Sequence, residues 1–211
     1  MNSFYFQNKV LHAESVPVSD LMGAYGSPLY IYSKSQIEFN WQQFEKSFGS
    51  HPHLICYAVK ANSNLAVLNV LANLGSGFDI VSIGELERVI AAGGNPKKCV
   101  FSGVAKTEQA IQKALEYGIY CFNVESVAEL DRIESVAASL KMNAPISIRV
   151  NPNVDAKTHP YISTGLTENK FGVSVEIALS LYKKTNLSDH LEVFGLDYHI
   201  GSQITDISPF L

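Results

Sequence analysis

Short apolar runs, most of them followed by a helix-like stretch, recur along most of this chain. The runs lie at residues 54–59, 78–81, 99–101, 119–124, 146–150 and 191–198. They contain few polar alternations, which is typical of parallel strands with both faces covered. Strands that alternate with helices indicate an α/β fold, either a doubly wound sheet or a β/α barrel. A closed barrel of the TIM type has eight strands, so we expect an open sheet or an incomplete barrel with about six of eight.

Capping residues support the helical stretches between these runs. Helices are expected at residues 64–74, 84–92, 108–117 and 127–140. Thr107 and Ser126 are suited to cap the last two, and Gly93 and Gly94 end the second. In the last one, apolar side chains recur at helical spacing.

Two segments depart from this alternation. Residues 1–30 are mixed in character and predict a strand or two outside the main sheet. Residues 151–169 are rich in Asn, Thr, Pro and Gly and follow the fifth run directly. Long irregular loops at the carboxyl ends of barrel strands commonly carry function, so we expect a functional loop there.

Composition excludes several classes of protein. Of 211 residues, 46% are hydrophobic and 17% are charged, which is globular and not disordered. The formal net charge of −4 offers no electrostatic attraction to nucleic acid or to an anionic membrane. No apolar run is long enough for a membrane span, and the amino terminus lacks the pattern of a secretory signal.

The three cysteines and six histidines are widely scattered. They form neither a disulfide framework nor a set with metal-ligand spacing, so no metal site is expected. A reduced, cytoplasmic protein is the simplest interpretation.

Lys60 and Asp79 are the first two candidates for chemistry. Lys60 closes the first apolar run, and a desolvated lysine at that end of a barrel strand is a nucleophile toward an aldehyde. Alternatively, it is a strand-end lysine that reaches solvent. Asp79 is the one charge in the second run. It would either cap a helix or turn, or pair with a buried amine or cofactor ring.

Three further strand ends carry polar side chains. Arg149 lies in the fifth run and needs a partner, either an acid or an anionic ligand. His199 closes the sixth run and could stack on a flat ring, while Ser202 in the following Gly-Ser turn could contact a phosphate. Glu85 suits the first turn of a helix. Side chains from several strand ends converge in a barrel active site, which is where we expect these residues.

Five motifs resemble those of the diaminopimelate decarboxylases. These enzymes are pyridoxal 5'-phosphate (PLP) dependent decarboxylases with the alanine-racemase-like barrel fold. The motifs, which occur in family order and cover most of the chain, are YAVKAN (57–62), GSGFDIVSIGEL (75–86), RVNPNVDAKT (149–158), NKFG (169–172) and GLDYHIGSQ (195–203). Residues 149–172, with His159-Pro160 and Thr164-Gly165, resemble this family more than the ornithine or arginine decarboxylases.

The resemblance implies a function and a role for each candidate. The reaction would convert meso-diaminopimelate to L-lysine and carbon dioxide, the last step of lysine biosynthesis. Lys60 would be the catalytic residue and would hold PLP as a Schiff base. His199 would stack on the ring and Ser202 would help to hold the phosphate. Asp79, Glu85 and Arg149 would form the polar network around them.

The resemblance also implies what the chain lacks. Family members continue with further barrel strands, a glycine-rich phosphate loop and a carboxyl-terminal β domain, and act as homodimers. Residues 1–30 would normally lie beside that β domain, and residues 31–211 would form the incomplete barrel. We therefore expect a partial chain that is inactive alone. The alternatives are an ornithine, arginine or carboxynorspermidine decarboxylase, a non-catalytic PLP-binding barrel protein, and an open-sheet binding module without a cofactor.

Overall fold

The computed structural model describes residues 3–154, 171–202 and 204–210. Residues 155–170, which hold most of the expected functional loop and its His159-Pro160 and Thr164-Gly165 motifs, lie outside the described residues. Within the described part, no helix combines the length and apolar character that crossing a bilayer requires.

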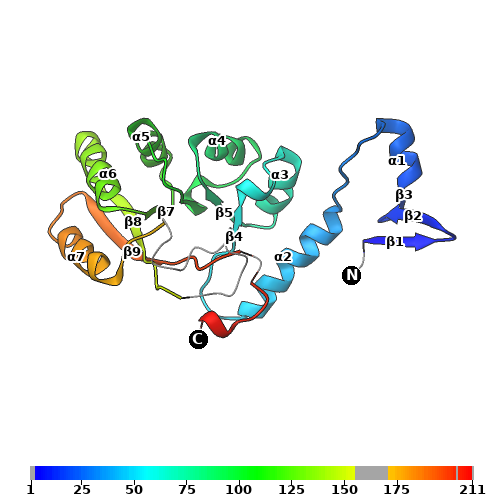
Figure 1. Ribbon diagram of the computed structural model, residues 1–211. Coiled ribbons are helices and arrows are strands. Elements are labelled where there is room, and N and C mark those ends of the chain that lie inside the picture. Colours follow the sequence, from blue (N-terminus) through cyan, green and yellow to red (C-terminus); the bar gives the residue numbers. More distant parts are fainter. Residues whose placement is uncertain (1–2, 155–170, 203, 211) are drawn as a thin grey trace.

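Six parallel strands form the main sheet, in the order in which they occur along the chain (Figure 1). They are β4 (Cys56–Ala58), β5 (Gly77–Ile80), β6 (Cys99–Phe101), β7 (Cys121–Val124), β8 (Ala144–Arg149) and β9 (Leu191–Asp197). A doubly wound sheet reverses its strand order, whereas a barrel adds each strand beside the previous one. The sequential order therefore resolves the open alternative in favour of an incomplete β/α barrel, with the six strands predicted.

Helices follow the strands and lie on the outer side of the curved sheet (Figure 1). They are α3 (Leu65–Asn73), α4 (Ile83–Ala91), α5 (Glu108–Tyr117), α6 (Val127–Leu140) and α7 (Val175–Thr185). Thr107 and Ser126 accept the expected capping hydrogen bonds, and Asn64, Ser82 and Ser174 cap the other three. Each cap satisfies an otherwise unpaired N–H, and the starts of α5 and α6 were accessible from the sequence through Thr107 and Ser126.

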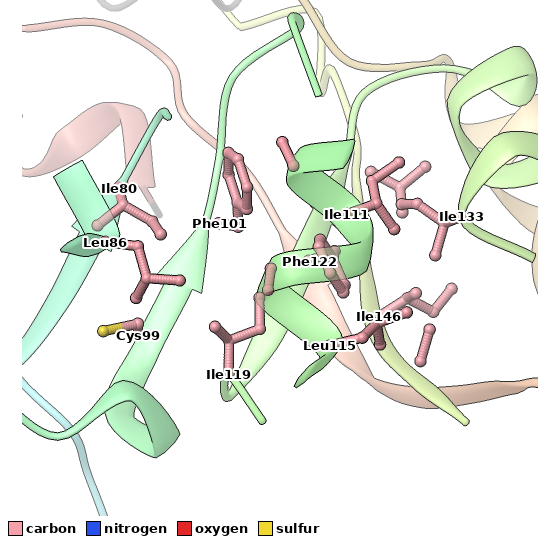
Figure 2. Packing of buried hydrophobic residues seen from close by; sticks show 14 of the residues in the cluster. Ile80, Leu86, Cys99, Phe101, Ile111, Leu115, Ile119, Phe122, Ile133 and Ile146 are labelled. Atoms are coloured by element: carbon pink, nitrogen blue, oxygen red, sulfur yellow. The ribbon is translucent and has the colours of Figure 1, made fainter. Parts of the chain in front are cut away.

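The core fills the space between the strands and these helices. Phe101, Phe122 and Ile146 point from the sheet toward Ile111, Leu115 and Ile133 of α5 and α6 (Figure 2). Successive strand residues face opposite sides of a sheet. The alternate residues, including Asp79 and Asn123, consequently face the inner side, where the cavity described below lies.

The segment before the barrel forms a small unit of its own. Strands β1 (Phe4–Gln7), β2 (Val10–Ala13) and β3 (Val16–Pro17) pair antiparallel, and α1 (Val18–Tyr25) follows. Helix α2 (Lys34–Phe48) then connects to the barrel (Figure 1). The sequence predicted strands outside the main sheet but missed α1, α2 and α7. Neither α1 nor α2 has a fully buried residue. In α2, Ile37 and Trp41 pack partly buried against the core, and their spacing of four residues was a usable helical signal.

Candidate active site

A cavity of about 470 Å³ opens on the inner face of the sheet. It is lined by residues from all six strands and the turns that follow them: Cys56, Lys60, Asp79, Val81, Val100, Ser102, Gly103, Val104, Asn123, Glu125, Arg149, Phe171, Asp197, Tyr198 and His199. Four of the six residues predicted from the sequence are among them. The carboxyl ends of parallel strands therefore meet at one site, as the barrel fold requires.

Lys60 lies in a short 3-10 turn (Val59–Ala61) immediately after β4. The prediction that it ends the strand is wrong by two residues, because β4 stops at Ala58. Its side chain lines the cavity but is exposed. Lys60 is therefore not buried as expected, and its position agrees with the alternative of a lysine that reaches solvent.

Asp79 accepts a hydrogen bond from Ser102 Oγ at 2.5 Å, and Asn123 Nδ2 donates to Ser102 Oγ at 3.1 Å. Burial raises the pKa of the Asp79 carboxyl. The Ser102 hydrogen bond and the positive charges of Lys60, His199 and Arg149 oppose that rise. The helix that follows is capped by Ser82 instead, so the alternative role of Asp79 as a helix cap does not apply.

Arg149 forms an ion pair with Glu125, whose Oε1 lies 2.8 Å from Arg149 Nη1. The two side chains are 12% and 2% exposed. The other carboxylate oxygen of Glu125 accepts from the Gly172 N–H at 3.2 Å, and the guanidinium lies 5.2 Å from the centre of the Phe171 ring. The acid partner expected for Arg149 is therefore present, and the arginine lines the cavity as well.

His199 follows β9 and lines the cavity. Burial lowers the pKa of its imidazole, and the positive charges of Arg149 and Lys60 lower it further. The ring is accordingly favoured in its neutral form at neutral pH, which suits stacking on a flat ligand.

Glu85 and Ser202 are not brought to the cavity wall in the part of the chain described. Glu85 accepts from the Val81 N–H at 2.7 Å, and its own N–H donates to Ser82 Oγ. This closely resembles a capping box at the start of α4, which agrees with the helix-terminal role considered for Glu85. Ser202 is exposed.

The sequence did not single out Ser102, Asn123, Glu125 or Asp197. Burial raises the pKa of the Asp197 carboxyl, and Arg149 opposes that rise. All four are polar residues in or directly after the carboxyl ends of strands. That position was a usable signal, but which of them touch depends on strand register.

Comparisons with known proteins identify the family. The pyridoxal binding domain of the pyridoxal-dependent decarboxylases matches residues 34–211. The chain belongs to this family. The match confirms the pyridoxal cofactor class that the motifs implied.

Several similar relatives are diaminopimelate decarboxylases. The diaminopimelate decarboxylase of Vibrio cholerae is 59% identical over 207 residues, which are 98% of this chain and 50% of that protein. Among solved structures, the enzyme from Helicobacter pylori complexed with L-lysine has a TM-score of 0.89 and 48% identity, covering 91% of this chain and 49% of its own. The M. jannaschii enzyme in complex with L-lysine has a TM-score of 0.91 and 39% identity, covering 99% and 50%. The chain spans about half the length of the curated relatives that it matches.

Proposed function

We propose that a full-length chain containing these residues decarboxylates meso-diaminopimelate to L-lysine and carbon dioxide, with PLP bound at Lys60. The observation that carries the proposal is the shared cavity, where the Lys60 amine, the Asp79 carboxylate and the His199 imidazole meet. Relatives named diaminopimelate decarboxylase, 50% to 59% identical, support the substrate.

The residues of the cavity suit PLP. The cavity of about 470 Å³ falls in the range of small-molecule sites. When bound, PLP supplies a ring that accepts the electron pair released as carbon dioxide leaves. Lys60 presents the amine that holds the cofactor, and the exposed position of that amine gives an aldehyde access to it.

The other cavity residues bind and orient in this proposal. The neutral His199 offers a flat face to the ring. The Asp79 carboxyl, held by Ser102, lines the same cavity as Lys60 and is influenced by its positive charge. Arg149 is fixed by Glu125 and lines the cavity, where the other N–H groups of its guanidinium are suited to donate to an anionic substrate or cofactor group. Glu85 acts on the site through the start of α4, and Ser202 is assigned to the cofactor phosphate by its motif.

Residues 1–30 are proposed to pack against a carboxyl-terminal β domain, next to a barrel that begins at residue 31. In residues 3–30 only Ser3 and Ala13 are buried, and Phe6 and Tyr25 are 73% and 76% exposed. So small a core favours packing against another unit. A cytoplasmic homodimer is proposed on the same resemblance.

The experiment is a decarboxylation assay on the full-length chain, with carbon dioxide release measured from meso-diaminopimelate, ornithine, arginine and carboxynorspermidine. We expect release from meso-diaminopimelate and its loss in Lys60→Arg. Faster carbon dioxide release from another of these compounds would show that meso-diaminopimelate is the wrong substrate. No release from any of them, with PLP bound, would favour a non-catalytic PLP-binding protein.

A further inference from the structure

A buried lysine contacts two residues of the cavity wall without lining the cavity itself. Lys106 lies between β6 and α5, and its side chain is 0% exposed. Its Nζ donates to the backbone oxygen of Gly103 at 2.6 Å, to that of Asn123 at 2.7 Å and to Glu129 Oε1 at 2.8 Å. An ammonium group has three donors, so Lys106 is fully satisfied by these partners.

Glu129 connects Lys106 to Glu125, another residue of the cavity wall. Its side chain is 3% exposed, and its Oε1 also accepts from the backbone N–H of Glu125 at 3.3 Å. Its own N–H donates to Ser126 Oγ, which caps α6. Lys106 and Glu129 together therefore hold the backbone of residues 123–125 at both ends.

The held segment carries the two polar contacts that define the site. The side chain of Asn123 donates to Ser102, which donates to Asp79. The side chain of Glu125 pairs with Arg149. A displacement of the segment would therefore alter the surroundings of Asp79 and Arg149 together.

Stability alone does not account for a charged pair at this position. A buried ion pair must recover a large desolvation cost, and apolar residues of similar volume often stabilise a protein as well or better. The pair has one property that apolar residues lack. It forms hydrogen bonds to the turn after β6, at Gly103, and to the end of β7, at Asn123 and Glu125.

We infer that Lys106 and Glu129 are positioning residues of the candidate site, which set the places of Asp79 and Arg149 through residues 123–125. The inference rests on the proposed function, because the expected effect of misplacing Asp79 and Arg149 is weaker binding of PLP.

The test uses the double variant Lys106→Met/Glu129→Gln in the full-length chain, which removes both charges and leaves neither unpaired. Two quantities are measured: the pKa of the Asp79 carboxyl by carbon-13 NMR without PLP, and the affinity for PLP. We expect the Asp79 pKa to rise, because the donors that favour its charged form are no longer held. We expect PLP affinity to fall by roughly tenfold, which is the scale seen when residues that orient the ligands of a bound metal are replaced.

A matched control makes the same chemical changes at an exposed pair. Lys113 and Glu87 lie 3.0 Å apart with side chains 52% and 50% exposed, so Lys113→Met/Glu87→Gln should leave both quantities unchanged. Thermal unfolding shows which variants are folded. If the double variant does not fold, Glu129→Asp keeps both charges but shortens the acid that reaches the Glu125 N–H, and it should move both quantities in the same directions by less.

The outcomes separate the two proposals. A folded buried-pair variant with unchanged Asp79 pKa and PLP affinity would overturn the positioning role. A shifted Asp79 pKa in a chain whose unsubstituted form does not bind PLP would uphold that role and overturn the proposed function.

Discussion

Arg149, at the end of β8, forms an ion pair of 2.8 Å with Glu125, which directly follows β7 and is 2% exposed. Replacing Glu125 with Ala leaves the guanidinium without its carboxylate. Losing one partner of a buried pair costs on the order of 3–5 kcal/mol, and we expect the free energy of unfolding to fall by roughly that amount. Urea denaturation measures it. Asp131→Ala breaks a surface pair with Lys184 and should lower the free energy of unfolding far less. Equal losses in the two variants would contradict the larger contribution expected of the buried pair.

Asp79→Asn should change the dependence of stability on pH. Burial raises the pKa of the Asp79 carboxyl. An acid with a raised pKa in the folded state makes no difference while both states are protonated, and it destabilises the fold as pH rises through its unfolded and folded values. The variant should therefore gain stability relative to the parent chain above the ordinary aspartate range and match it below. A stability difference that does not vary with pH would contradict the burial argument.

His199→Gln should change stability in the opposite pH direction, as pH falls. The pKa of His199 is lowered, first by burial. Protonation therefore favours the unfolded chain, and the parent should lose stability as pH falls through the ordinary histidine range. We expect the variant to lose less over that interval, measured by thermal unfolding at a series of pH values. If the variant loses more stability than the parent as pH falls, the folded protein favours the charged imidazole and the burial argument is wrong.

Phe122→Ala tests the outer core that holds the strands in place. The ring is fully buried and stacks on Phe101 with centroids 5.9 Å apart. Truncating a buried phenylalanine typically costs about 3–5 kcal/mol, because transfer and cavity terms add. Urea denaturation should show a loss of this order. Phe6→Ala, at a ring 73% exposed, is the control and should have a small effect; comparable losses would place the core elsewhere.

The sequence predicted the fold better than the details of the site. Apolar runs located all six strands of the sheet, since a strand covered on both faces leaves a strong local pattern. Helix α2 carries a weaker signal, since none of its residues is fully buried and Ile37 and Trp41 pack only partly buried against the core. At the site, Lys60, Asp79, Arg149 and His199 were predictable from their positions at strand ends and from their motifs.

Contacts between strands were not predictable in the same way. The pairing of Arg149 with Glu125 depends on how β7 and β8 align, and β8 and β9 shift register between Ile146 and Ser147. The burial of Lys106 leaves no local pattern, because two of its three hydrogen-bond partners, Asn123 and Glu129, come from later segments. For Glu85 the sequence correctly indicated the position at a helix start, but that position does not bring the side chain to the cavity wall in the described residues.

The most direct test of the account is borohydride reduction of the protein in the presence of PLP, followed by peptide mass mapping. The full-length chain is measured beside this chain of 211 residues. Lys98, which donates to the Gly75 backbone oxygen away from the cavity-lining residues, serves as the internal control. The account predicts a pyridoxyl group on Lys60 and none on Lys98. A folded full-length chain that carries no adduct at Lys60, or carries it equally at both lysines, would contradict the assignment of Lys60 as the cofactor-binding residue.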